Sequence, residues 1–153
     1  GGTGLVPPLV LSPDAELADA TEEAAAAWSA ATGLPIVLGS GGADLFLTEG
    51  LEGCGHTSTW RDWDGSLIRV ASIEVRDPGG RCMPWSSTLR HELGHAIQQW
   101  WSRDALPPDA DGHTDVGLMH PKASGEPVID LPAIELICGA APCTEFRPEA
   151  SEE

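Results

Sequence analysis

Apolar residues recur at helical spacing in the first part of the chain. Between Ser12 and Gly33 they follow one another three or four residues apart, which is typical of one face of an amphipathic helix. We expect Ser12 to cap this helix, Pro13 to occupy its first turn and Gly33 to end it. A sheet or a second helix should cover the apolar face and place Trp28 in the core; the face consists of Leu17, Ala20, Ala24, Ala27, Trp28 and Ala31.

From Pro35 onward, short extended runs separated by glycine replace the helical pattern. Four such runs predict a small sheet, and they cover residues 36–38, 44–48, 57–60 and 67–75. Asp64 and Gly65 lie between the last two runs and are typical of a hairpin turn. These two runs are therefore expected to be antiparallel neighbours.

The last third of the chain predicts a loop, a turn and a short helix. Residues 104–115 are rich in Pro and Asp and favour a loop, and residues 117–121 favour a tight turn. Asp130 should open a short helix that ends near Cys138. Residues 1–8 and the acidic tail 144–153 are expected to be flexible.

The length and the order of these elements predict one domain of the α+β class. A chain of 153 residues matches the usual size of a single folding unit, so we expect residues 1–153 to form one domain. In this domain a small, twisted, mostly β-sheet packs on the N-terminal helix and on a second helix that follows the sheet.

The charge balance excludes some partners. Lys and Arg number 8 against 24 Asp and Glu, a formal net charge of -16, which repels phosphate backbones and anionic lipid headgroups. No uninterrupted apolar run approaches the roughly 18 to 20 residues that a membrane-spanning helix requires. We therefore expect a soluble monomer that binds no nucleic acid and has no membrane-spanning segment.

The four cysteines favour an oxidising compartment. Their number is even and no C-x-x-C pair is present, which favours two disulfides over a Cys-rich zinc site. Of the three possible pairings we expect Cys54 with Cys82 and Cys138 with Cys143; reduced cysteines in the cytosol are the alternative. The chain begins with Gly1 and lacks a targeting segment, so we expect a trimmed fragment of a secreted, extracytoplasmic or surface-anchored protein.

The residues that carry chemistry lie on the second predicted helix, at about residues 86–101. His91, Glu92 and His95 form an H-E-x-x-H motif, in which both imidazoles lie on one side of a helix and can bind the same zinc ion. Glu92 is rotated by about 100° from His91, so its carboxylate can act as a general base without being a ligand. By chance the motif arises about once in a few hundred chains of this length, so a helix without metal is the weaker alternative. The opposite side of the helix is apolar at Leu89, Leu93, Ala96, Ile97 and Trp100.

A third ligand must come from elsewhere, because catalytic zinc commonly takes three protein ligands and a water. His113 is the nearest histidine downstream of the motif. The other histidines are His56 and His120, and the carboxylate candidates are Asp115 and Glu126.

The motif at residues 91–95, the later His113 and a turn that contains Met119 resemble the metzincin zinc proteases, whose signature ends in a Met-turn. The matrixin branch is the most similar, since its order of elements matches nearly the whole chain. The resemblance implies a metzincin-like fold with a short C-terminal helix and a zinc endopeptidase that cleaves polypeptides. It further implies three zinc ligands, a general base and an apolar floor under the metal, which are His91, His95 and His113, Glu92, and Met119.

The chain departs from the family pattern after the second histidine. Gln98 stands at the position of the family's glycine, and Trp101 stands at the position of its third histidine. We therefore expect the zinc helix to continue and an inserted loop to return His113 to the metal. Asp115 is the alternative third ligand, as in the aspzincins, which also carry H-E-x-x-H. A zinc-containing binding domain without turnover is the alternative function.

Two further groups of residues have simpler interpretations. Asp62 and Asp64 can contact calcium, but two acids in a turn are more typical of turn chemistry, so a calcium site stays unsupported. Burial is expected for five tryptophans that could otherwise line a substrate groove: Trp60, Trp63, Trp85, Trp100 and Trp101.

Overall fold

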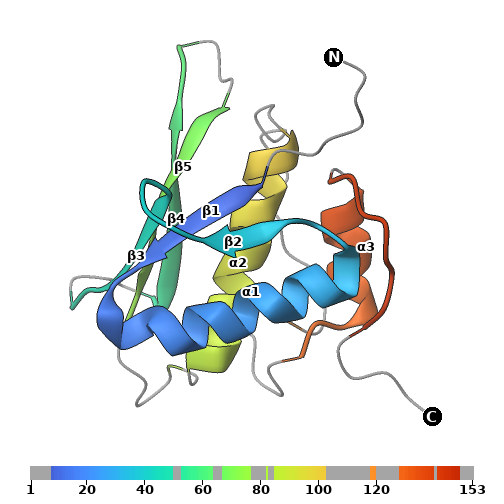
Figure 1. Cartoon of the computed structure of the whole chain (residues 1–153), viewed down its shortest axis with the longest axis horizontal. Helices are drawn as coiled ribbons and strands as arrows, with labels where there is room; N and C mark the ends of the chain where they lie inside the picture. Colours follow the sequence, from blue (N-terminus) through green and yellow to red (C-terminus); the bar gives the residue numbers. More distant parts are fainter. Residues whose placement is uncertain are drawn as a thin grey trace.

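The computed structural model describes residues 8–49, 53–63, 67–76, 82, 85–102, 118–119, 128–139 and 141–148. These residues form an α+β fold, as expected, with a five-stranded mixed sheet and three α-helices (Figure 1). The strands are β1 (Leu9–Pro13), β2 (Ile36–Leu38), β3 (Ala43–Leu47), β4 (Gly55–Arg61) and β5 (Leu67–Val75). The helices are the 3-10 helix η1 (Ala15–Leu17) and the α-helices α1 (Ala18–Thr32), α2 (Trp85–Ser102) and α3 (Leu131–Cys138).

The sheet has the strand order β2-β1-β3-β5-β4. The first four of these strands are parallel to their neighbours, and β4 runs antiparallel to β5 at one edge. The predicted hairpin is thereby confirmed, with Thr57 opposite Ile73 and Ser58 opposite Ser72. All four runs predicted as strands are strands in the structure.

The predicted start of the first helix is wrong. Ser12 and Pro13 belong to β1, which lies between β2 and β3 in the sheet, and α1 begins only at Ala18 after the short η1. The local Ser-Pro-Asp sequence resembles a helix start, but pairing with two neighbouring strands decides the conformation here. The predicted end is confirmed: Gly33 closes α1 with a φ of 76°, a conformation that favours glycine.

One face of the sheet forms the core together with α1 and α2. Successive side chains of a strand point to opposite faces, and Leu9, Leu11 and Leu45 are buried while Val10 and Asp44 are less so. From α1, Trp28 is fully buried, as expected, and its indole N–H donates to the Arg90 carbonyl of α2 at 2.9 Å. The core therefore fixes α2 against both the sheet and α1.

The C-terminal helix α3 lies beside the end of α1 (Figure 1). Asp130 caps it by accepting a hydrogen bond from the Ala133 N–H at 3.0 Å, which confirms its predicted start. After α3 the chain returns along α1, where the Thr144 N–H donates to the Thr32 carbonyl at 2.8 Å. Both expected disulfides are present, Cys54–Cys82 and Cys138–Cys143.

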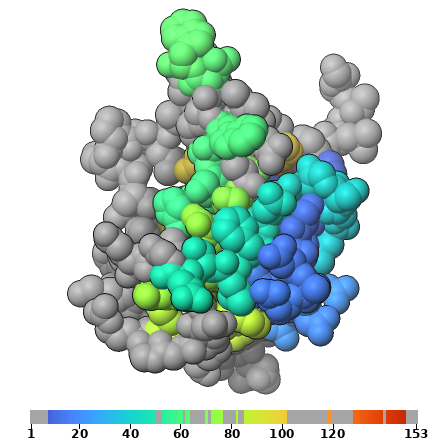
Figure 2. Space-filling model, turned by 90° about the vertical axis from the view of Figure 1, so that its left-hand side faces the viewer, coloured from blue at the N-terminus to red at the C-terminus, as the bar shows by residue number. Residues whose placement is uncertain are grey.

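The tryptophans of the β4–β5 hairpin are exposed, contrary to the expected burial. Trp60 is 57% exposed and Trp63 is 93% exposed. In Figure 2 the green atoms of this hairpin stand clear of the molecular surface at the top. By contrast Trp85, Trp100 and Trp101 are partly buried against the core. No helix among the described residues is both long enough and apolar enough to cross a membrane.

Candidate metal centre

The fold presents His91 and His95 from a helix whose opposite side is anchored in the core. Leu89, Leu93 and Ile97 of α2 have no exposed surface, so this side of the helix is held by close packing. Because residues four apart lie on one face of a helix, both histidines project from the same side of α2. Rigid seating of the backbone fixes where the two imidazoles meet.

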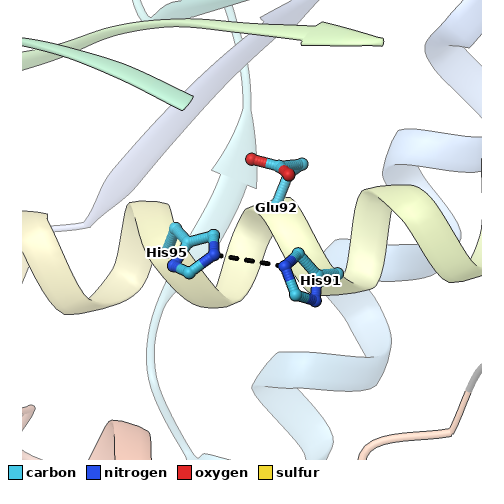
Figure 3. Close-up of side chains that lie close together, drawn as sticks. All are labelled: His91, Glu92 and His95. Atoms are coloured by element: carbon cyan, nitrogen blue, oxygen red, sulfur yellow. Dashed lines mark hydrogen bonds between the residues drawn. The ribbon is translucent and has the colours of Figure 1, made fainter. Parts of the chain in front are cut away.

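The two imidazoles converge on one point. Figure 3 shows both rings on one side of α2, with the carboxylate of Glu92 projecting from a different side of the helix. The Nε2 atoms of His91 and His95 are 3.2 Å apart, and the ring centroids are 4.8 Å apart in an edge-on arrangement. One nitrogen of each ring and one carboxylate oxygen of Glu92 lie within 4.8 Å of one another, a grouping that can hold a metal ion.

Hydrogen bonds on the far side of each ring set the tautomer. The Nδ1 of His91 lies 2.7 Å from the Leu118 carbonyl oxygen, and the Nδ1 of His95 lies 3.3 Å from Oε1 of Gln98. Carbonyl oxygens only accept, so each Nδ1 donates in its contact, and in a neutral imidazole the lone pair then lies on Nε2. Two lone pairs that face each other at 3.2 Å form an arrangement suited to a shared cation.

Burial favours the neutral form of His91. Removal from water lowers the pKa of His91 below its ordinary value of 6.5, and the hydrogen bond to the Leu118 carbonyl offsets part of this effect. A neutral imidazole is the form that binds a metal. His91 is therefore in the form suited to metal binding at neutral pH.

Residues 118–119 lie against the histidine helix at Gly94 and His91. Met119 is fully buried, and a Cβ at Gly94 would lie only 2.6 Å from its sulfur, so the close contact requires glycine at this position of the motif. Leu118 is fixed in turn, because its N–H donates to Oδ2 of Asp130 at 2.8 Å. Asp130 thus connects the start of α3, through Leu118, to the ring of His91. The sequence predicted Asp130 as a helix start only.

Glu92 is held by strand β4. Its side chain is only 6% exposed, and its Oε1 accepts a hydrogen bond from the Thr57 hydroxyl at 2.7 Å. Gly55, two residues before Thr57, lets the strand come close to the same carboxylate. Neither residue was found from the sequence, because threonine and glycine in a strand carry no signal of a distant partner.

The structure brings together three of the predicted site residues, His91, Glu92 and His95. His56 lies on β4 next to Thr57, so its side chain points to the opposite face of the sheet and is exposed. Asp62 accepts a hydrogen bond from the Trp63 N–H at 2.8 Å, as turn chemistry predicts. The remaining candidates lie outside the described residues: Asp64, His113, Asp115, His120 and Glu126.

Comparison with protein families and curated proteins identifies no relative of this chain. No protein-family model matches the chain, and a search of curated proteins finds no similar sequence. The functional argument therefore rests on the geometry of the site.

Proposed function

We propose that the chain is a zinc-dependent endopeptidase with a metzincin-like fold, in which His91 and His95 bind one zinc ion and Glu92 is the general base. The observation that carries the proposal is the 3.2 Å separation of the two Nε2 atoms. Two nitrogens each about 2.0–2.1 Å from one tetrahedral zinc ion would lie roughly 3.3–3.4 Å apart. The histidine pair therefore fits zinc with almost no rearrangement.

The arrangement of the elements also supports a metzincin-like fold. After strand β1, helix α1 with Trp28 near its end precedes the other four strands, the histidine helix α2 follows them, and the short helix α3 comes last. Met119 lies against Gly94 of the histidine helix, as an apolar floor requires. The third ligand in this proposal is His113, with Asp115 as the alternative.

The residues of the site suit peptide hydrolysis. A bound zinc ion would supply Lewis-acid chemistry, since it would polarise a carbonyl group and lower the pKa of a water molecule to about 7. Glu92 takes a proton from the water that attacks the scissile carbonyl and gives it to the departing amine. One of its carboxylate oxygens lies within 4.8 Å of a nitrogen of each imidazole, which places it near the expected metal position.

The edge strand β4 provides a place for a polypeptide substrate. Within the described part of the sheet, β4 pairs with β5 along one edge and no strand pairs with its other edge. An extended peptide can add to such an edge through backbone hydrogen bonds. Thr57 of β4 contacts Glu92, so a peptide on this edge would run close to the general base.

We also infer an extracytoplasmic location. Two disulfides within one small chain are typical of proteins that fold in an oxidising compartment. Extracellular polypeptides are the corresponding substrate class.

Zinc content and casein cleavage, measured on the same samples, test the proposal. The wild type should carry one zinc per chain and cleave casein until a chelator is added. His91→Ala should lose zinc, while Glu92→Gln should keep zinc and lose about 10²- to 10⁴-fold in cleavage. His56→Ala is the matched control for zinc content, because it removes a histidine that faces away from the group.

Each contrary result identifies a different alternative. Full zinc content without cleavage of any unstructured protein would support a zinc-containing binding domain. A wild-type protein without zinc would refute the proposal and would favour a purely structural role for the histidine helix. His113→Ala and Asp115→Ala, compared in the same assay, distinguish the two candidates for the third ligand.

A further inference from the structure

Two residues of strand β4, Thr57 and Gly55, lie against the carboxylate of Glu92. The hydroxyl of Thr57 is 2.7 Å from Oε1 of Glu92 and 3.1 Å from the backbone carbonyl oxygen of the same residue. A hydroxyl has a single proton, and the shorter contact is the one to the carboxylate. A hydrogen bond to a charged acceptor is also the stronger of the two. The hydroxyl of Thr57 therefore donates mainly to Oε1.

Gly55 approaches the carboxylate from the same face of β4 as Thr57. Alternation along the strand places positions 55 and 57 on one face. A Cβ at Gly55 would lie 2.8 Å from Cγ of Glu92, 3.0 Å from its Oε2 and 3.0 Å from Cγ2 of Thr88. The strand thus approaches the carboxylate so closely that any side chain at position 55 would displace it.

Because Glu92 is buried, its hydrogen bond to Thr57 affects both the energy and the orientation of its carboxylate. Glu92 is 6% exposed, and a carboxylate removed from water needs polar partners to offset the cost of desolvation. The Thr57 hydroxyl binds Oε1 and thereby restricts rotation of the carboxylate. A catalytic base performs best when its geometry is fixed before the substrate arrives.

We infer that Thr57 is a positioning residue for Glu92, which fixes the orientation of the carboxylate that takes the proton of the attacking water. This inference rests on the proposed peptidase function. It also connects substrate binding to catalysis, because Thr57 lies on the edge strand to which a peptide would add. The residue acts through its hydrogen bond to Glu92.

Steady-state cleavage of a fluorogenic peptide tests the inference. Thr57→Val keeps the shape and strand propensity but removes the hydroxyl, and it should lower kcat about 10- to 100-fold while KM changes by less than about twofold. Thr57→Ser keeps the hydroxyl and should retain kcat to within about threefold. Both variants should keep one zinc per chain. Thr21→Val makes the same exchange at a buried threonine of α1 and should leave kcat unchanged.

A double-mutant cycle separates positioning from a general loss of structure. If Thr57 acts through the carboxylate, then Thr57→Val should cause no further loss in the Glu92→Gln background. An additive loss there would overturn the inference. Gly55→Ala provides a second test that leaves the hydroxyl in place, and it should lower kcat with zinc retained, because the added Cβ displaces the carboxylate.

The outcomes distinguish this inference from the proposed function. A wild type that binds no zinc or cleaves no peptide refutes the function, and the inference with it. A wild type that cleaves, together with an unchanged kcat in Thr57→Val, refutes the inference alone. Equal losses in Thr57→Val and Thr57→Ser would also refute it, since the hydroxyl would then not be the cause. If Thr57→Val does not fold, Thr57→Ala replaces it in the same comparison.

Discussion

The two long helices α1 and α2 pack on the same sheet and on each other, but they bury different kinds of side chain. The fully or nearly buried polar residues of α1 are two threonines, Thr21 and Thr32. Those of α2 include two charged groups and comprise Ser87, Thr88, Arg90, Glu92 and Gln98. Burial of polar groups costs free energy unless partners compensate for it, so the larger and charged set on α2 depends more on such partners.

The partners of these polar groups differ as well. On α1 the Thr32 hydroxyl donates to the Trp28 carbonyl of its own helix at 2.6 Å. On α2 the partners lie mostly on other elements or at the site: Arg90 pairs with Glu23 of α1 at 3.3 Å, and Glu92 binds Thr57 of β4. The difference indicates that α1 is chiefly structural and that α2 is organised around its histidines.

The largest expected effect tests the structural role of α1. Trp28→Ala removes a fully buried indole and should lower the free energy of unfolding by about 3–5 kcal/mol in urea titrations. The protein that remains folded should still bind one zinc per chain. Ala26→Ser on the exposed side of α1 is the control and should change stability by less than about 0.5 kcal/mol. Loss of zinc from folded Trp28→Ala would mean that α1 also shapes the site.

A smaller effect is expected at Asp130, which supports the histidine helix from outside it. Asp130→Ala removes the cap of α3 and the acceptor for the Leu118 N–H. We expect zinc affinity to fall about 10-fold, because Leu118 no longer orients His91, and stability to fall by about 1 kcal/mol. Competition with a chromophoric chelator and urea unfolding measure the two effects. A loss of stability with unchanged zinc affinity would mean that Asp130 only caps α3 and does not orient His91.

The smallest effect is a pH dependence of the zinc-free protein. Burial lowers the pKa of His91 in the folded state, so the unfolded chain takes up this proton first as the pH falls below 6.5. Stability should therefore be independent of His91 above pH 6.5 and should decline below it, toward the lowered pKa. Urea unfolding of the chelator-treated protein between pH 7.5 and 5.5 measures the decline. The decline should be smaller in His91→Gln, and an equal decline there would assign it to other groups.

Most elements could be predicted because their signals are local. Glycine after a helical stripe ends α1 at Gly33, and the Asp-Gly pair between two extended runs correctly predicted the antiparallel β4–β5 pairing. The disulfide pairing Cys138–Cys143 follows from short separation along the chain. Strand β1 was missed for the converse reason: a Ser-Pro-Asp sequence has a strong local preference, and its parallel partners β2 and β3 come more than twenty residues later.

The sequence by itself determined the histidine pair and the place of Glu92 next to it, since an i, i+4 spacing on a helix fixes the relative positions of His91 and His95. It also determined the apolar side that anchors α2. Only the tertiary structure decided what orients these groups: Leu118 and Asp130 behind His91, and Thr57 and Gly55 around Glu92. Helical geometry is set within one turn of chain, whereas a hydrogen bond between β4 and α2 depends on how the whole sheet packs against the helix.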